Sequence, residues 1–165
     1  MQSTIKRLVL IYTAISLVFF LGILWLVDFS HVDLPDNAFG YKIRPYGLLM
    51  LLAFVIVFLL LQKRILRYKA SSSILELVGT SLAVSLLSLF LYQLIRQYLV
   101  IGASFPAEMG YILLSSLVPS IVSGFIAAMI AVELKKIKGV WKHIPLVALL
   151  LLFLLFKQYL SAIEW

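Results

Sequence analysis

The chain has 165 residues, of which 64% are hydrophobic and 13% are charged, and its mean hydropathy is +1.12. Soluble domains are usually about half apolar and about a quarter charged, so the composition excludes a soluble globular protein and indicates an integral membrane protein. No polar segment between the apolar runs is long enough to form its own core, which predicts one bundle over residues 1–165. The chain has no cysteine, which excludes disulfides, thiolate metal sites and thiol nucleophiles.

Five apolar segments predict an all-α, polytopic bundle of transmembrane helices. A helix crosses the hydrocarbon layer with about 20 apolar residues. The second segment is shorter, but Pro45 favours a helical start, and the side chains of Lys63 and Arg64 can extend to water at its end. The predicted spans cover residues 8–27, 46–61, 74–95, 111–132 and 144–163.

The last segment allows two interpretations, because its apolar run ends at Lys157. If Lys157 extends its ammonium to the interface, the helix continues and places Tyr159 and Trp165 in the outer aromatic belt. Five spans then put the N-terminus in the cytoplasm and the C-terminus outside. The alternative is four spans and a re-entrant or interfacial C-terminal helix. We favour the fifth span, because the segment lacks the polar face of an interfacial helix.

Basic residues predict the orientation. Lys6 and Arg7 precede the first span, and two further clusters follow the second and fourth spans, so all three lie on one side if every segment crosses once. The positive-inside rule makes that side the cytoplasm and the protein a multi-pass protein of the inner membrane. These residues are an ordinary topogenic cluster or, alternatively, contacts for anionic membrane lipids. The candidate lipid contacts are Lys63, Arg64, Arg67, Lys69, Lys135, Lys136 and Lys138.

The fourth span differs from its leucine-rich neighbours in its small residues, which recur every fourth position and form two adjacent rows. Small side chains on one stripe let two backbones approach closely, so we expect this helix to pack against another helix. The third span carries similar rows. A short outer turn joins it to the fourth span, which makes the two an antiparallel pair. The predicted packing interface, within the chain or with partner helices, is Gly79, Ser81, Ala83, Ser85, Ser116, Ser120, Gly124 and Ala128.

Polar and helix-breaking residues within the spans suggest further roles. Ser73 and Glu76 have the spacing of a capping box at the start of the third span, although an acid in a span can also relay protons. Pro119 predicts a bend, with the hydroxyls of Ser115 and Ser116 placed to satisfy the freed carbonyl. Gly139 is placed to cap the end of the fourth helix. At the outer end of the third span, a candidate polar mouth comprises Gln93, Arg96 and Gln97.

The sequence contains no constellation that predicts catalysis. It has no HExxH or GxSxG motif, and the serines of the third and fourth spans lack a neighbouring base in the sequence. Oxygen and imidazole ligands occur together in the first outer loop, but their spacing matches no defined metal motif, so we expect a solvated loop. Those residues are Asp28, His31, Asp33 and Asp36. We therefore expect no enzyme activity, cofactor, metal or nucleic-acid partner.

From the second span to the fourth, the order is an apolar helix, a short basic linker (QKRILRYKASSS), a small-residue helix (ILELVGTSLAVSLLSLFLYQLI), and a Pro/Ser/Gly helix with a basic tail (LVPSIVSGFIAAMIAVELKKIK). This order resembles an uncharacterised bacterial family of small four-helix inner-membrane proteins, a domain of unknown function. The chain lacks the long polar insert that such proteins often carry and adds a fifth apolar segment. The resemblance implies no activity and no site residues.

These features predict a small non-enzymatic membrane subunit or accessory protein, associated with other integral membrane proteins or with itself. The alternative is a small transporter or channel-like oligomer whose pathway lies near the bent fourth span. Against this alternative, the sequence places no charged residue at the middle of a span, although transport pathways commonly use one.

Overall fold

The computed structural model describes residues 2–25, 45–101 and 109–161, and within these ranges the chain is helical and contains no strand. The long helices are α1 (Gln2–Leu24), α2 (Pro45–Tyr68), α3 (Ile74–Ile95), α4 (Met109–Leu134) and α5 (Ile144–Ser161). The first four are long and apolar enough to cross a membrane, and a shorter apolar stretch lies at Val140–Leu152. The prediction of a helical membrane bundle is thereby confirmed.

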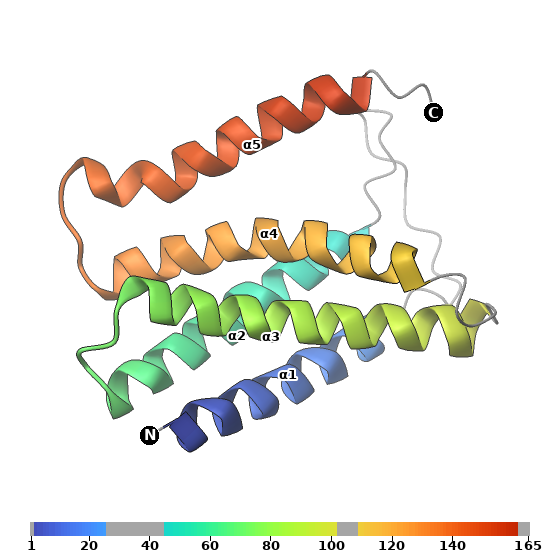
Figure 1. Ribbon diagram of the computed structural model, residues 1–165, viewed down its shortest axis with the longest axis horizontal. Helices are drawn as coiled ribbons and strands as arrows, with labels where there is room; N and C mark the ends of the chain where they lie inside the picture. The colour runs from blue at the N-terminus through green and yellow to red at the C-terminus, as the bar shows by residue number, and fades with distance from the viewer. Residues whose placement is uncertain (1, 26–44, 102–108, 162–165) are drawn as a thin grey trace.

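Helices α1 to α4 form the body of the bundle, and α5 lies at its edge (Figure 1). Helix α3 packs against both α4 and α1, α1 also packs against α2, and α2 contacts α4. Helix α5 packs mainly against α4, to which it is joined by the 3-10 stretch η3 (Val140–His143). The beginning of α1, the α2–α3 connection and the end of α4 share one end of the body, so the basic clusters lie together there (Figure 1).

Aromatic rings fill the core between α1, α2 and α3. The ring centroids of Phe20 and Phe54 lie 4.9 Å apart edge to face, and Phe54 stacks on Phe58 at 5.2 Å. Phe20 also meets Tyr92 of α3 edge to face, at 5.9 Å. Offset and edge-to-face contacts of this kind add to the van der Waals packing that holds helices together in lipid. This side of the bundle is held by large apolar groups.

Helix α2 continues past the predicted end of its span. The sequence predicts a span that ends at residue 61, whereas the helix runs to Tyr68 and the side chain of Gln62 is fully buried. The helix is longer than the predicted span because Lys and Arg are good helix formers, so it continues beyond its hydrophobic edge. Gln62 belongs to the interior of the bundle.

Helix α3 begins as predicted. The hydroxyl of Ser73 accepts a hydrogen bond from the backbone N–H of Glu76 at 3.1 Å, which is the N-cap half of a capping box. The Glu76 carboxylate accepts from Lys69 Nζ at 2.9 and 3.1 Å. This ion pair ties the α2–α3 connection to the first turn of α3.

Lys136, and not the predicted Gly139, caps the C-terminal end of α4. Lys136 has a left-handed φ of 54°, its N–H donates to Glu133 O, and the Ile137 N–H donates to Val132 O. This pair of bonds is a Schellman motif, in which Lys136 takes the place usually held by glycine. Gly139, with φ of 82°, precedes η3 instead.

Candidate functional site in the seam between α3 and α4

Six serines line the contact between α3 and α4, and we call them the serine seam. They are Ser81, Ser85 and Ser88 of α3 and Ser116, Ser120 and Ser123 of α4, each 0 or 1% exposed. Intervals of three and four residues put each set on one face of its helix. The small-residue rows of the two helices therefore face each other within this chain.

Most seam hydroxyls bond to a carbonyl of their own helix. Ser81 donates to Leu77 O at 2.9 Å, and Ser116 donates to Ile112 O at 2.6 Å. Ser88 and Ser120 likewise donate to the carbonyl four residues earlier, each at 2.7 Å. A buried hydroxyl without a partner is unfavourable, so these local bonds let polar groups line a dry contact.

Hydroxyl contacts also join the two helices. Ser123 Oγ lies 2.6 Å from Ser85 Oγ and 2.8 Å from Ser120 O, and its single proton can donate to either acceptor. Ser85 Oγ in turn donates to Ser120 Oγ over a longer 3.4 Å. The three hydroxyls connect the middle of α3 to the middle of α4.

Gln62 extends the seam to a third helix. Its Nε2 donates to Ser81 Oγ at 3.1 Å and to Ala127 O at 2.9 Å, so one side chain of α2 binds both α3 and α4. The opposite orientation of the amide would place Oε1 against the carbonyl of Ala127, two acceptors without a proton, so the bond to Ala127 fixes the orientation. The sequence alone gives no signal for this role, because Gln62 stands where an apolar run meets a basic cluster.

The predicted packing residues divide into inward and outward groups. A Cβ on Gly124, which is buried, would lie 3.2 Å from Leu82 Cδ1, so α3 and α4 approach closely there. Ala83 and Ala128 are partly buried. Gly79 is exposed, and nothing lies within 4 Å of the position of its missing Cβ.

The residues of the candidate polar mouth lie where α3 passes into the π-helical stretch η2 (Arg96–Ile101). Gln93 and Arg96 are partly buried, whereas Gln97 is only 6% exposed. Gln97 thus faces the packed interior, and Gln93, although partly buried as a whole, also buries its Oε1.

The hydroxyls near Pro119 act differently from the sequence expectation. Ser115 and Ser116 both donate to Ile112 O, at 3.1 and 2.6 Å. The carbonyl that a proline leaves without its usual donor lies four residues earlier, at Ser115. The prediction that these hydroxyls satisfy it is wrong, because the carbonyls one turn earlier are within closer reach.

The candidate lipid contacts lie at the basic end of the bundle. The exposed members are Lys63, Arg64, Arg67, Lys136 and Lys138, and the partly buried members are Lys69 and Lys135. Lys69 is paired with Glu76, while Lys142 is paired with Glu133 at 3.0 Å. Lys135 donates to the carbonyl of Ala70 and so joins the end of α4 to the α2–α3 connection.

The loop residues Asp28, His31, Asp33 and Asp36 lie outside the described residues. Within the described ranges, no group of three or more His, Cys, Asp or Glu side chains is placed to hold a metal ion. No family model, curated protein or solved structure matches the chain. The seam provides close helix packing and local hydrogen bonding, and these are the properties on which a functional proposal can be built.

Proposed function

We propose that the chain is a small non-enzymatic integral membrane subunit or accessory protein of a cytoplasmic-membrane complex. The proposal includes α5 as a fifth span, with the N-terminus in the cytoplasm and the C-terminus outside. The observation that carries it is the outward position of Gly79. The seam serines and Gly124 are buried inside the chain, but Gly79 presents bare backbone to the surroundings.

The outward face of α3 suits a partner helix. Leu75, Gly79, Ala83 and Leu86 follow one another at helical intervals, and Leu75 and Leu86 are 82% and 42% exposed. Lipid does not require a small residue in the middle of such a face, whereas a second helix packs closely against one. Membrane proteins of the same complex, or a second copy of the chain, are the partners that this face fits.

The test replaces Gly79 with isoleucine in the full chain and compares the chains that co-purify in mild detergent. The matched control is Gly22→Ile on α1, since Gly22 is also exposed with nothing within 4 Å of its Cβ position. We expect Gly79→Ile to lose partners or reduce the native size, and Gly22→Ile to keep both. Retention of every partner and the native size by Gly79→Ile would contradict the proposed face.

Gln62 supports a second candidate, a small transporter or channel-like oligomer. Its Oε1 is buried and lacks a hydrogen-bond partner among the described residues, so an uncompensated polar atom lies beside the seam. Polar groups inside a membrane bundle often mark a pathway. Flux measurement on the purified chain in liposomes distinguishes the candidates. An accessory subunit alone should conduct nothing, whereas a pathway lined by Gln62 should conduct and should lose flux in Gln62→Met.

A further inference from the structure

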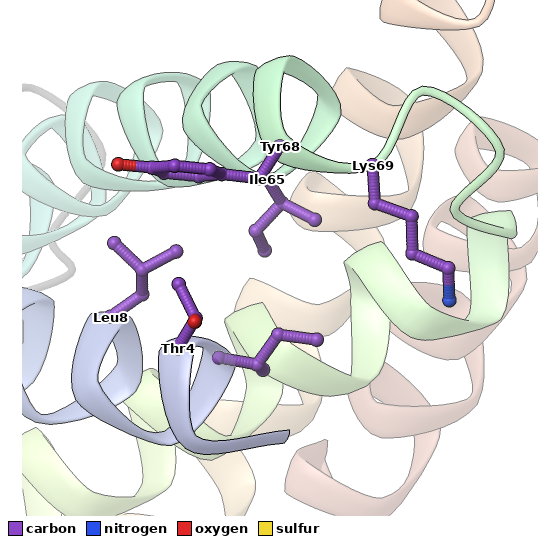
Figure 2. Close-up of a pocket in the computed structure, with 6 residues that line it drawn as sticks. Thr4, Leu8, Ile65, Tyr68 and Lys69 are labelled. Carbon is purple, nitrogen blue, oxygen red and sulfur yellow. The ribbon is translucent and has the colours of Figure 1, made fainter. Parts of the chain in front are cut away.

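A pocket of about 120 Å³ opens between the first turns of α1 and the last turns of α2. Figure 2 shows its lining, in which side chains of α1 face side chains of α2 across the gap. The lining residues are Thr4, Ile5, Leu8, Ile65, Tyr68 and Lys69. Most of this surface is hydrocarbon, and the ammonium of Lys69 is held by Glu76. The pocket itself therefore suits an apolar group.

One cation lies beside the pocket, and two more lie at the same end of the bundle. Lys6 and Arg7 are exposed on the first turns of α1, but their side chains leave other faces of the helix than the lining residues do. Arg64 donates to the hydroxyl of the lining residue Tyr68 at 3.3 Å, and its guanidinium lies 5.4 Å from that ring centroid. Among the described residues, the ion pairs at this end join Lys69 to Glu76 and Lys142 to Glu133. The positive charge of Arg64 therefore remains available to an anion.

We propose that this pocket binds one anionic phospholipid, with a hydrocarbon segment in the pocket and the phosphate beside Arg64. The size agrees with this occupant, since a pocket of about 120 Å³ is small. That space takes part of an acyl chain but no whole soluble ligand, whose pockets are typically about 300–1,000 Å³. Exposed apolar side chains of α1, Ile11, Ile15 and Val18, continue the apolar surface along which the rest of the acyl chain lies.

The combination of hydrocarbon and charge favours a lipid over a free anion. Inorganic phosphate would gain nothing from the apolar wall, whereas a phospholipid uses the wall and the cations together. Basic residues near a membrane surface attract anionic headgroups by about 1 kcal/mol each, a general attraction that any of the basic clusters provides. If the site is specific, lipid affinity must depend more on the charged residues beside the pocket than on equally charged residues elsewhere. The site is separate from the proposed partner face on α3.

Native mass spectrometry of the full chain in detergent tests the proposal with phosphatidylglycerol and phosphatidylcholine as probes. We expect phosphatidylglycerol to bind preferentially, and Arg64→Gln to weaken that binding about fivefold, the equivalent of ~1 kcal/mol. Thr4→Phe should weaken it by filling the pocket without changing the charge. The control Lys138→Gln removes an exposed cation at the same end that does not line the pocket, and should leave binding within about twofold.

Four results would overturn the site. Equal binding of the two lipids would remove the role of the cations, and an equal effect of Lys138→Gln and Arg64→Gln would leave only diffuse attraction. Displacement of the lipid by millimolar inorganic phosphate, or no effect of Thr4→Phe, would show that the pocket is not used. The unfolding temperature of each variant in detergent shows whether it retains the fold. If Thr4→Phe does not fold, Arg64→Gln, which changes only a surface side chain, still tests the site.

Discussion

Gln62 places a primary amide where α2, α3 and α4 meet, and it holds both neighbouring helices through one nitrogen. Replacement by methionine keeps the length of the side chain but removes both hydrogen bonds. We expect Gln62→Met to reduce the free energy of unfolding by about 1–2 kcal/mol, the range of interhelical hydrogen bonds in membrane proteins. Unfolding of the purified chain in mixed detergent micelles measures the change.

The adjacent Lys63 offers the control, because it is exposed on the same turn of the same helix. Lys63→Met makes the same kind of side-chain change without a buried partner and should leave stability unaltered. Equal effects of the two substitutions would show that the amide does not hold the three helices together.

Lys136 adopts a backbone conformation that glycine adopts without a penalty. The left-handed region is unfavourable by roughly 1–2 kcal/mol for a residue with a side chain, so we expect Lys136→Gly to stabilise the fold by about 1 kcal/mol. Lys138→Gly serves as the comparison, since Lys138 is not among the described residues with positive φ. A thermal unfolding series in one detergent measures both, and a lower unfolding temperature for Lys136→Gly would contradict the expectation.

Residue patterns predicted the inward rows and missed two individual positions. Ser85, Ser120 and Gly124 follow from spacing alone, because small residues at helical intervals have few other uses in lipid. Gln62 was missed because it adjoins the basic cluster, where a polar residue normally marks the end of a span. Lys136 was missed because a lysine carries no sequence signal for left-handed backbone. Both depend on contacts that form only in the folded bundle.

At the scale of elements, the α3–α4 contact depends on volume more than on hydrogen bonds. A Cβ at Gly124 already meets Leu82 at 3.2 Å, so a branched side chain there must push the helices apart. We expect Gly124→Ile to destabilise the fold by about 1–3 kcal/mol, as overpacking usually does. Gly79→Ile, on the open side of α3, should leave the isolated chain as stable as the wild type in the same unfolding measurement.

Removal of a seam hydroxyl should have a smaller effect. Ser85→Ala loses the contacts to Ser123 and Ser120, but Ser123 can still donate to Ser120 O. We expect a loss near 0.6 kcal/mol, the average for such bonds in a membrane bundle. If Ser85→Ala destabilised the chain more than Gly124→Ile in micelle unfolding, hydrogen bonding and not packing would hold the two helices together.

The boundaries of the elements were predictable where the polarity changes sharply. Ser73 marks the start of α3 because its hydroxyl satisfies an early N–H, and the predicted start of the span at residue 74 coincides with it. The end of α2 was not predictable in this way, since Lys63, Arg64 and Arg67 remain helical outside the apolar run. Hydropathy reports where a helix leaves lipid, and helix propensity decides where it ends.

At the scale of the whole molecule, the number of spans is open to a direct test. The chain contains no cysteine, so a single introduced thiol reports its own side of the membrane. Ser3→Cys and Ser161→Cys place thiols at the beginning of α1 and the end of α5. With five spans, a membrane-impermeant maleimide added to intact cells should label Ser161→Cys, and should label Ser3→Cys only after permeabilisation. Protection of both thiols in intact cells would favour the re-entrant α5.

The local bonding of the seam hydroxyls also bears on how the bundle assembles during biosynthesis. Ser81 and Ser116 each bond within their own helix, so α3 and α4 can enter the bilayer one after the other without carrying unsatisfied hydroxyls into lipid. Gln62 differs, because its amide finds its acceptors on α3 and α4, which are synthesised after α2. Helix α2 therefore gains the two hydrogen bonds of this amide only when α3 and α4 pack against it.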